Sequence, residues 1–495
     1  MFKRLLMSLL CLQLLIPLLL QASQNSILEN LSSVEIKRFD KIEMQFTAEN
    51  SYDNPYTDGS FSAQVTSPSG NEFEVDGFWY DSDMWKLRIM PTETGEYSYI
   101  TSSDDPGLNG NSGSFQCVES EHPGMLIVNE DYPYTFKLSH GGPFFWMGET
   151  SWLMMSDAVS FSSGVFQKLI DTRVSQKFNG IHFVLGTGGL PIGTDNPTNE
   201  GGYLWISQQE QRVNPDFFKW MDRRVEYVHE KQMVLGFFIT WAQHYSQFTK
   251  EEYERLERYL IARYAAYPLL YWVIVGEFDE SGKINDYNDH GEFIDEHDPY
   301  GHLISNHPGH SDPDNLGTSR IFAGQSWFDF IIQQFPDYPG HYDADDINKA
   351  LLEDRNRNLP VVNIEFGYEE MKYDGKVFSR DMVRKSAWAT AVGGGFPSYG
   401  HKETIRTVDT DYLETPGTDY MTILYDFFTT LHWWEMQPEN DRVDNGFCLS
   451  RDVIDYVIYL PDGGTVGVDL RENVGIYLAK WFNPKTGSYN DTQKV

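Results

Sequence analysis

Two glutamates follow apolar runs and have the residue type and setting for acid–base chemistry. Glu365 ends the run PVVNIE (360–365), and Glu277 ends the run YWVIVGE (271–277). Both runs are rich in β-branched residues, which is typical of buried strands in a parallel sheet. Because a buried carboxylate is costly to desolvate, one in this position is expected to have a partner or a task. The pattern therefore predicts a carboxylate pair at one edge of a sheet.

A carboxylate pair is what glycoside hydrolysis requires. One carboxylic acid protonates the leaving oxygen, and a second carboxylate acts as the nucleophile or as the base for water. We assign Glu277 as the acid/base and Glu365 as the nucleophile, and we expect a retaining mechanism. The alternative for each is a structural carboxylate held by arginine or by backbone amides.

The elements that must position this pair alternate between strand-like and helical runs from residue 122 to residue 437. Alternation of this kind is the pattern of βα units. The candidate strands are residues 144–148, 180–185, 234–240, 271–275, 302–306, 328–332, 361–364 and 394–398. Eight such units predict a (β/α)8 TIM barrel. A doubly wound open sheet is the alternative, but the first βα turn lacks a glycine-rich phosphate fingerprint.

In such a barrel the active site lies at the carboxyl ends of the strands. Carboxylates, imidazoles, amides and indoles occur there, and these groups suit a polar ligand with many hydroxyls. The candidate substrate-binding residues are Glu149, Trp152, Trp241, His244, Asp279, His307, Gln334, Tyr399 and His401. A glycine-rich loop, residues 186–202, follows the second strand. For Glu149, a structural role in holding neighbouring loops is an equal alternative.

No metal and no cofactor are expected. The histidines at the strand ends lack the His-x-x-x-His or His-x-His spacing of metal ligands. His307 and His310 are three residues apart, but they lie in a loop that contains proline and glycine. The sequence also lacks a Gly-x-Ser-x-Gly elbow, a Walker loop and zinc-finger spacing.

The charge and the first residues bear on partners and location. The net charge of −35 excludes nucleic acid as a partner, because such binding relies on lysine and arginine at phosphates. Two basic residues precede the apolar run 5–20, so residues 1–23 are predicted to be a secretory signal peptide. We expect a secreted or periplasmic protein that is not inserted in a membrane after cleavage. Cys117 and Cys448 then remain as separate thiols, and the sequence does not indicate an oligomeric state.

The barrel region is flanked by segments with strand patterns. Residues 24–121 contain short alternating strands separated by turns, which predicts an N-terminal β-sandwich. Its expected role is packing, with carbohydrate binding as the alternative. Residues 438–495 return to strand patterns, including 456–460, 465–468 and 475–482, and predict a small C-terminal β-domain that is short for a complete sandwich.

At the strand ends the chain resembles the apiosidase-like glycoside hydrolases, family 140 and its relatives. The matching stretches are PFFWMGETSW (143–152), NGIHFVLG (179–186), VIVGEFDE (273–280), FIIQQF (330–335), LPVVNIEFGYE (359–369) and GGGFPSYGH (393–401). The resemblance implies a secreted (β/α)8 enzyme with a β-sandwich before the barrel and a small β-domain after it. It also implies hydrolysis of a side chain of a plant or algal polysaccharide. The chain departs from the family pattern at Glu149 and Glu277, where aspartate is usual.

These observations together predict a secreted glycoside hydrolase that acts on a plant or algal polysaccharide or its oligosaccharides. One alternative is a carbohydrate-binding protein without catalytic activity on an enzyme-like barrel. The other is a polysaccharide lyase, for which Tyr399 with His401 could supply the base.

Overall fold

The computed structural model describes residues 35–186, 197–280, 282–310, 318–336, 338–403, 410–452, 454–471 and 475–494. The predicted signal peptide lies outside these residues. The chain forms two compact units, of which the first comprises the residues up to His122 together with Arg258–Pro268, and the second comprises the remainder. Within the described parts of the chain, no helix has the length and apolar character needed to cross a bilayer.

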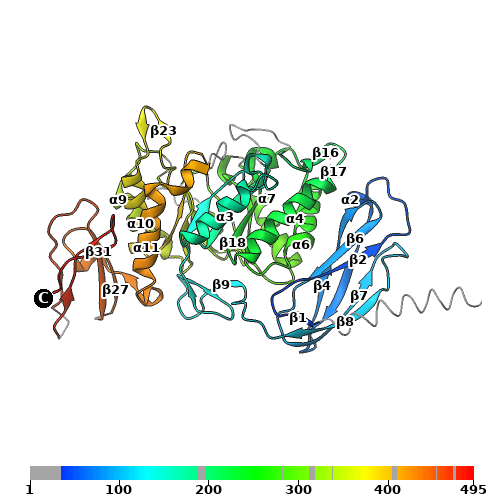
Figure 1. Cartoon of the computed structure of the whole chain (residues 1–495), viewed down its shortest axis with the longest axis horizontal. Helices are drawn as coiled ribbons and strands as arrows, with labels where there is room; N and C mark the ends of the chain where they lie inside the picture. Colours follow the sequence, from blue (N-terminus) through cyan, green and yellow to red (C-terminus); the bar gives the residue numbers. More distant parts are fainter. Residues whose placement is uncertain are drawn as a thin grey trace, which may run out of the picture. The chain divides into compact units, whose positions relative to one another are not determined.

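The first unit is a β-sandwich, as predicted (Figure 1). One sheet has the strand order β1-β8-β7-β3-β4 and the other has the order β2-β6-β5. The strands are β1 Glu35–Lys37, β2 Ile42–Thr47, β3 Ser62–Thr66, β4 Glu72–Asp76, β5 Phe78–Asp81, β6 Met84–Ile89, β7 Gly95–Ser102 and β8 Ser112–Val118. Alternate residues of these strands, such as Leu87 and Phe115, are buried in a core between the sheets. This packing is the expected result of period-2 patterning.

The second unit contains a barrel of eight parallel strands, which confirms the predicted (β/α)8 architecture. Hydrogen bonds join the strands in the order β20-β19-β18-β13-β12-β25-β22-β21. The strands are β12 Gly148–Thr150, β13 Gly180–Gly186, β18 Val234–Trp241, β19 Leu270–Gly276, β20 Leu303–Ser305, β21 Ile331–Gln333, β22 Val361–Asn363 and β25 Phe396–Tyr399. Every residue of β18 and β19 is buried, as expected for strands covered on both faces.

Helices alternate with the strands of the barrel (Figure 1). They include α3 Val165–Ser175, α4 Pro215–Glu230, α6 Lys250–Tyr264, α7 Ile284–His297, α9 Ala344–Arg355, α10 Arg380–Val392 and α11 Pro416–Phe428. Helices α4, α9 and α10 begin at residues whose side chains cap the helix. Helix α4 begins with Asn214 as N-cap and proline at its first position, a favoured pairing. Its buried face contains Phe218, Met221, Val225 and Val228, whose spacing of three or four residues is that of one face of a helix.

The first barrel strand lies later in the chain than predicted. The sequence places it at residues 144–148, but β12 begins at Gly148. Pro143–Phe144 instead forms β11, which pairs with β10 (Phe136–Leu138) in a small separate sheet. The reason is Trp146, whose fully buried ring packs against Phe136 and other rings and so occupies the core before the strand starts. Glu149 is therefore inside the strand and not at its end.

The C-terminal residues belong to the same compact unit as the barrel. The hairpin of β27 (Phe447–Arg451) and β28 (Asp455–Tyr459) is attached to the barrel by Tyr459, which stacks on Trp388 of α10 with a centroid separation of 5.5 Å. The predicted strand at 465–468 is wrong, since only an isolated bridge forms there at Val468. Gly463 and Gly464 before it have positive φ angles of 74° and 106°, which interrupt an extended backbone.

Candidate active site

Glu277 is placed by a tight turn at the end of β19. The strand ends at Gly276, opposite Trp241 at the end of β18. A Cβ on Gly276 would lie only 1.4 Å from the Trp241 ring, so only glycine allows the indole to lie against the backbone here. Glu277 itself has a φ of 52°, a left-handed conformation that is unusual for glutamate. A non-glycine residue in this region is a frequent mark of a functional position.

Glu365 follows β22, and its carboxylate has two close neighbours. The Tyr368 hydroxyl donates a hydrogen bond to Oε1, and Nε2 of His307 lies 3.3 Å from Oε2. Gly367, with a φ of 90°, makes the turn that brings Tyr368 back to Glu365. The Glu365 side chain is 10% exposed, so the carboxylate is mostly buried but open to solvent on one side.

His307 connects the loops that carry the two glutamates. Its Nδ1 accepts a hydrogen bond from the backbone N–H of Glu277 at 3.3 Å. An acceptor at Nδ1 requires the proton of a neutral imidazole to be on Nε2, the atom that faces Glu365. The backbone of His307 also accepts from the N–H of Phe278 at 3.0 Å. One fully buried imidazole thus fixes the turn at Glu277 and presents an N–H toward Glu365.

Trp152 packs against the residues that surround Glu365 and Glu277. Its indole N–H donates to the Tyr368 hydroxyl at 2.7 Å, and its ring packs against Trp241 and His307 with centroids 4.9 and 5.7 Å away. Burial, followed by the charge of Glu365, raises the pKa of Tyr368 well above its usual value. Tyr368 therefore stays protonated and remains a donor to Glu365.

Asp279 and Gln334 hold the loop that carries His307. The Asp279 carboxylate accepts a hydrogen bond from the Gly309 N–H at 2.7 Å. The side-chain amide of Gln334 lies beside the carbonyl oxygens of Pro308 and Gly309, and with its nitrogen turned toward them it donates to both, at 2.7 and 3.1 Å. Asp279 is exposed, so it can also contact a ligand, whereas Gln334 is 6% exposed and mainly supports the loop.

Glu149 and Tyr399 have supporting roles, and we revise the predicted contacts with substrate accordingly. The Glu149 carboxylate is fully buried and makes a bidentate ion pair with Arg173. The Tyr399 hydroxyl is also buried, and it donates to Glu369 at 2.6 Å. Of the two roles left open for Glu149, the structure therefore favours the structural one, because a sugar cannot reach its oxygens.

His244 and His401 are also buried away from solvent. His244 Nδ1 lies 2.9 Å from the Thr240 hydroxyl. His401 stacks on Tyr412 with a centroid separation of 5.2 Å, and burial lowers the pKa of His401 to about 4. A neutral, stacked His401 beside a buried Tyr399 does not offer the exposed base that a lyase needs.

Tyr368 and Arg173 are site residues that the sequence analysis missed. Tyr368 connects Trp152 to Glu365, and Arg173 neutralises Glu149 beneath the barrel mouth. The signal for Tyr368 was a hydroxyl three residues beyond Glu365, across a glycine that favours a turn. Arg173 lies in α3 and had no signal, because only the packing of α3 against the barrel brings it to Glu149, 24 positions earlier in the chain.

Two further expectations concern the loop and metals. Residues 187–196 of the glycine-rich loop lie outside the described residues. After them come β14 Thr198–Asn199, β15 Gly202–Tyr203, β16 Trp205–Ser207 and β17 Arg212–Val213. Among the residues that the structure describes, no group of three or more His, Cys, Asp or Glu side chains is arranged to hold a metal.

Comparison with known families gives a match over the barrel. The family described as the apiosidase-like catalytic domain matches residues 133–435. A domain of unknown function, DUF5060, matches residues 35–104 in the first unit. No curated protein is similar enough to be counted as a relative.

Solved structures of similar fold have low sequence identity to this chain. A protein from Bacteroides vulgatus, provisionally described as a glycoside hydrolase, has a TM-score of 0.67 at 18% identity, over 80% of this chain and 79% of that one. A family 5 glycoside hydrolase from the same organism has a TM-score of 0.63 at 20% identity, over 74% of this chain and 86% of its own. A third glycoside hydrolase has a TM-score of 0.61 at 19% identity, over 75% of this chain and 93% of its own. These similarities support the fold.

Proposed function

We propose that this chain, which belongs to the apiosidase-like family of glycoside hydrolases, cleaves a glycosidic bond of its substrate and uses Glu277 and Glu365 as the catalytic pair. The observation that carries this assignment is the shared contact through His307. Its two ring nitrogens face the backbone of Glu277 and the carboxylate of Glu365. The two glutamates therefore lie on opposite sides of one imidazole at the carboxyl edge of the barrel, where this fold places its chemistry.

The surroundings of the two carboxylates support different roles. Glu365 is mostly buried and is oriented by the Tyr368 hydroxyl and by His307 Nε2, which suits a nucleophile that must approach the anomeric carbon in one direction. Glu277 is half-buried between the buried residues Gly276 and Phe278, so it keeps some contact with solvent, which suits a group that exchanges protons with the leaving oxygen and then with water. A retaining reaction would use both in turn, as nucleophile and as acid followed by base.

We also propose that the protein is exported and that its substrate is a plant or algal polysaccharide or an oligosaccharide derived from one. The export proposal rests on the basic and apolar pattern of residues 1–23. Sequencing the amino terminus of the protein from its native host should give a start near residue 23 or 24. A chain that retains residues 1–23 and stays in the cytoplasm would contradict export.

The test of function is sugar release from a panel of plant and algal polysaccharides by the wild type, Glu277→Gln and Glu365→Gln. Removing a nucleophile or general acid is expected to reduce kcat by several orders of magnitude while the fold is kept. Glu353→Gln is the matched control, because Glu353 is exposed on α9 and away from the barrel mouth. Equal activity of Glu365→Gln and Glu353→Gln would remove Glu365 from the mechanism, and binding without turnover by the wild type would favour a binding protein.

The stereochemical outcome can be read from the first product. Proton NMR of the reducing sugar, recorded before mutarotation, should show the same anomeric configuration as the substrate. Azide added to Glu365→Gly should form a glycosyl azide of opposite configuration, whereas azide added to Glu277→Gly should form one of retained configuration by attacking the glycosyl-enzyme intermediate.

A further inference from the structure

The rim of the barrel carries a line of aromatic and imidazole rings that the proposed chemistry does not use. In order of contact they are Tyr373, Tyr338, His341 and His310, with centroid separations of 4.5, 5.4 and 6.0 Å between neighbours. They come from the loops that follow β22, β21 and β20, so they belong to the same edge of the barrel as the two glutamates. We refer to these four residues as the ring line.

Each end of the ring line belongs to a chain segment that also carries a neighbour of one of the glutamates. At one end, Tyr373 follows Tyr368 by five residues in the segment after β22. Tyr368 donates directly to Glu365. The ring line therefore begins in the same segment as the hydrogen-bond donor of the predicted nucleophile.

At the other end, His310 follows Gly309, which lies against the turn of the predicted acid. The Gly309 N–H donates to Asp279, and a Cβ on Gly309 would lie 3.5 Å from the Cβ of Glu277. The ring line thus extends from the neighbour of Glu365 to the neighbour of Glu277.

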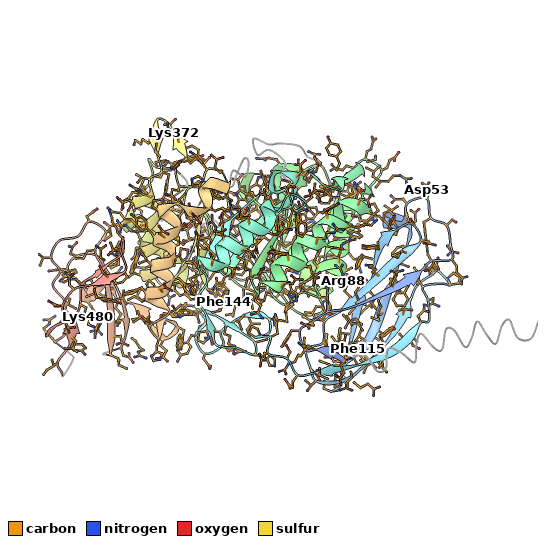
Figure 2. The ribbon with its side chains drawn as sticks, in the orientation of Figure 1. Asp53, Arg88, Phe115, Phe144, Lys372 and Lys480 are labelled. Atoms are coloured by element: carbon orange, nitrogen blue, oxygen red, sulfur yellow. The ribbon has the colours of Figure 1, made fainter. Side chains whose placement is uncertain are left out.

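Two of the four rings face solvent. Tyr338 is 41% exposed and His341 is exposed, whereas Tyr373 and His310 are half-buried. Tyr373 lies on a hairpin, β23 (Lys372–Tyr373) with β24 (Lys376–Val377), which projects from the barrel, as the position of Lys372 in Figure 2 shows. A pocket with a volume of about 340 Å³ opens beside this hairpin, lined by Glu370, Met371, Lys372, Lys402 and Glu403. Neighbouring exposed rings beside a polar pocket are typical of a binding surface.

We propose that the ring line is a sugar-stacking subsite for the residue next to the cleaved bond, and that the substrate is therefore a glycan chain and not a lone glycoside. This inference rests on the proposed function of the two glutamates. The flat faces of pyranose rings expose C–H groups that pack on aromatic rings, and the charged pocket can bind their hydroxyls. Tyr338 and Tyr373 meet edge to face at 77°, so the two rings hold each other in position.

A distant subsite of this kind should affect turnover as well as binding. Binding energy from a part of the substrate that does not react is used to hold the reacting centre in place, so shortened substrates lose kcat. A chain that reaches the ring line should be cleaved more efficiently than one that does not. A glycosyl fluoride, whose leaving group is too small to reach the rings, provides the comparison.

The experiment compares the wild type with Tyr338→Ala and Tyr373→Ala on a glycosyl fluoride and on oligosaccharides from disaccharide to hexasaccharide. We expect kcat/KM for the oligosaccharides to fall about tenfold or more, the loss expected when one ring face is uncovered. We expect kcat/KM for the glycosyl fluoride to stay within about twofold of the wild type. Tyr338→Phe should keep most of the activity, because it keeps the ring. Val377→Ala is the matched control for damage to the hairpin.

Binding measured in the Glu365→Gln background separates the subsite from the chemistry. Calorimetry with the same oligosaccharides should show weaker binding when Tyr338→Ala or Tyr373→Ala is added. If the wild type cleaves nothing but binding still depends on these tyrosines, the subsite stands and the proposed hydrolysis fails. Three results would each contradict the proposed subsite. The tyrosine variants could lose kcat/KM equally on the fluoride and the oligosaccharides, or they could keep kcat/KM on both. The third result is that no oligosaccharide binds at all.

Discussion

Tyr368→Phe is the most direct test of how the site is organised, because it removes one hydroxyl and keeps the ring. The hydroxyl makes two hydrogen bonds, one donated to Glu365 and one accepted from the Trp152 indole N–H at 2.7 Å. A hydrogen bond to a charged group contributes about 1.5–3 kcal/mol. If that bond orients the nucleophile, kcat/KM should fall by about 10- to 150-fold.

The same substitution should also reduce stability. Trp152 is 1% exposed, so its N–H would lose its partner in a region that water does not reach. Leaving such a donor unsatisfied costs about 1–3 kcal/mol of the free energy of unfolding. Thermal denaturation should therefore show a lower Tm, and kinetics must be measured at a temperature at which the variant is fully folded.

Tyr399→Phe is the matched control for this experiment. The Tyr399 hydroxyl is also buried, and it donates a hydrogen bond to the Glu369 carboxylate at 2.6 Å. The Thr415 hydroxyl lies 2.9 Å from it. We expect a comparable loss of stability but kcat/KM within about twofold of the wild type. If the folded forms of both variants lose activity equally, or if Tyr368→Phe keeps full activity, the argument that Tyr368 positions Glu365 is refuted.

Two further predictions concern buried charges in the barrel. Arg173→Met should lower the free energy of unfolding by about 3–5 kcal/mol, because it leaves the Glu149 carboxylate buried without a counter-charge. Chemical denaturation would measure this loss. A loss under about 1 kcal/mol would show that the ion pair is dispensable for stability. Burial raises the pKa of Asp329 from 3.8 to about 7, so the folded state holds this proton more tightly than the unfolded state does. The stability that Asp329 contributes is therefore complete below pH 3.8 and is lost as the pH rises through about 7. Asp329→Asn should flatten the dependence of unfolding free energy on pH across this window, and an unchanged slope would contradict the assignment.

The sequence by itself determined the class of fold and the general location of the chemistry. The alternation of β-branched runs and amphipathic helices predicts parallel strands, and the carboxyl ends of such strands must lie at one edge. Glu277 and Glu365 could be identified for that reason, since each follows a mainly apolar, strand-like run. The buried face of α4 could be predicted in the same way, because helical periodicity is a local property.

The tertiary structure decided which polar residues near the strand ends can reach the site. Glu149 follows an apolar run as the two other glutamates do, but Trp146 occupies the core and moves the strand, so Glu149 is buried against Arg173. The contact of His307 with both glutamate loops depends on closure of the barrel, which brings the ends of β19, β20 and β22 together although they are separate in sequence. The contact of Trp152 with Tyr368 joins residues that are 216 positions apart. Local patterns determine which residues follow a strand, whereas burial and hydrogen-bond partners depend on how strands pack against one another.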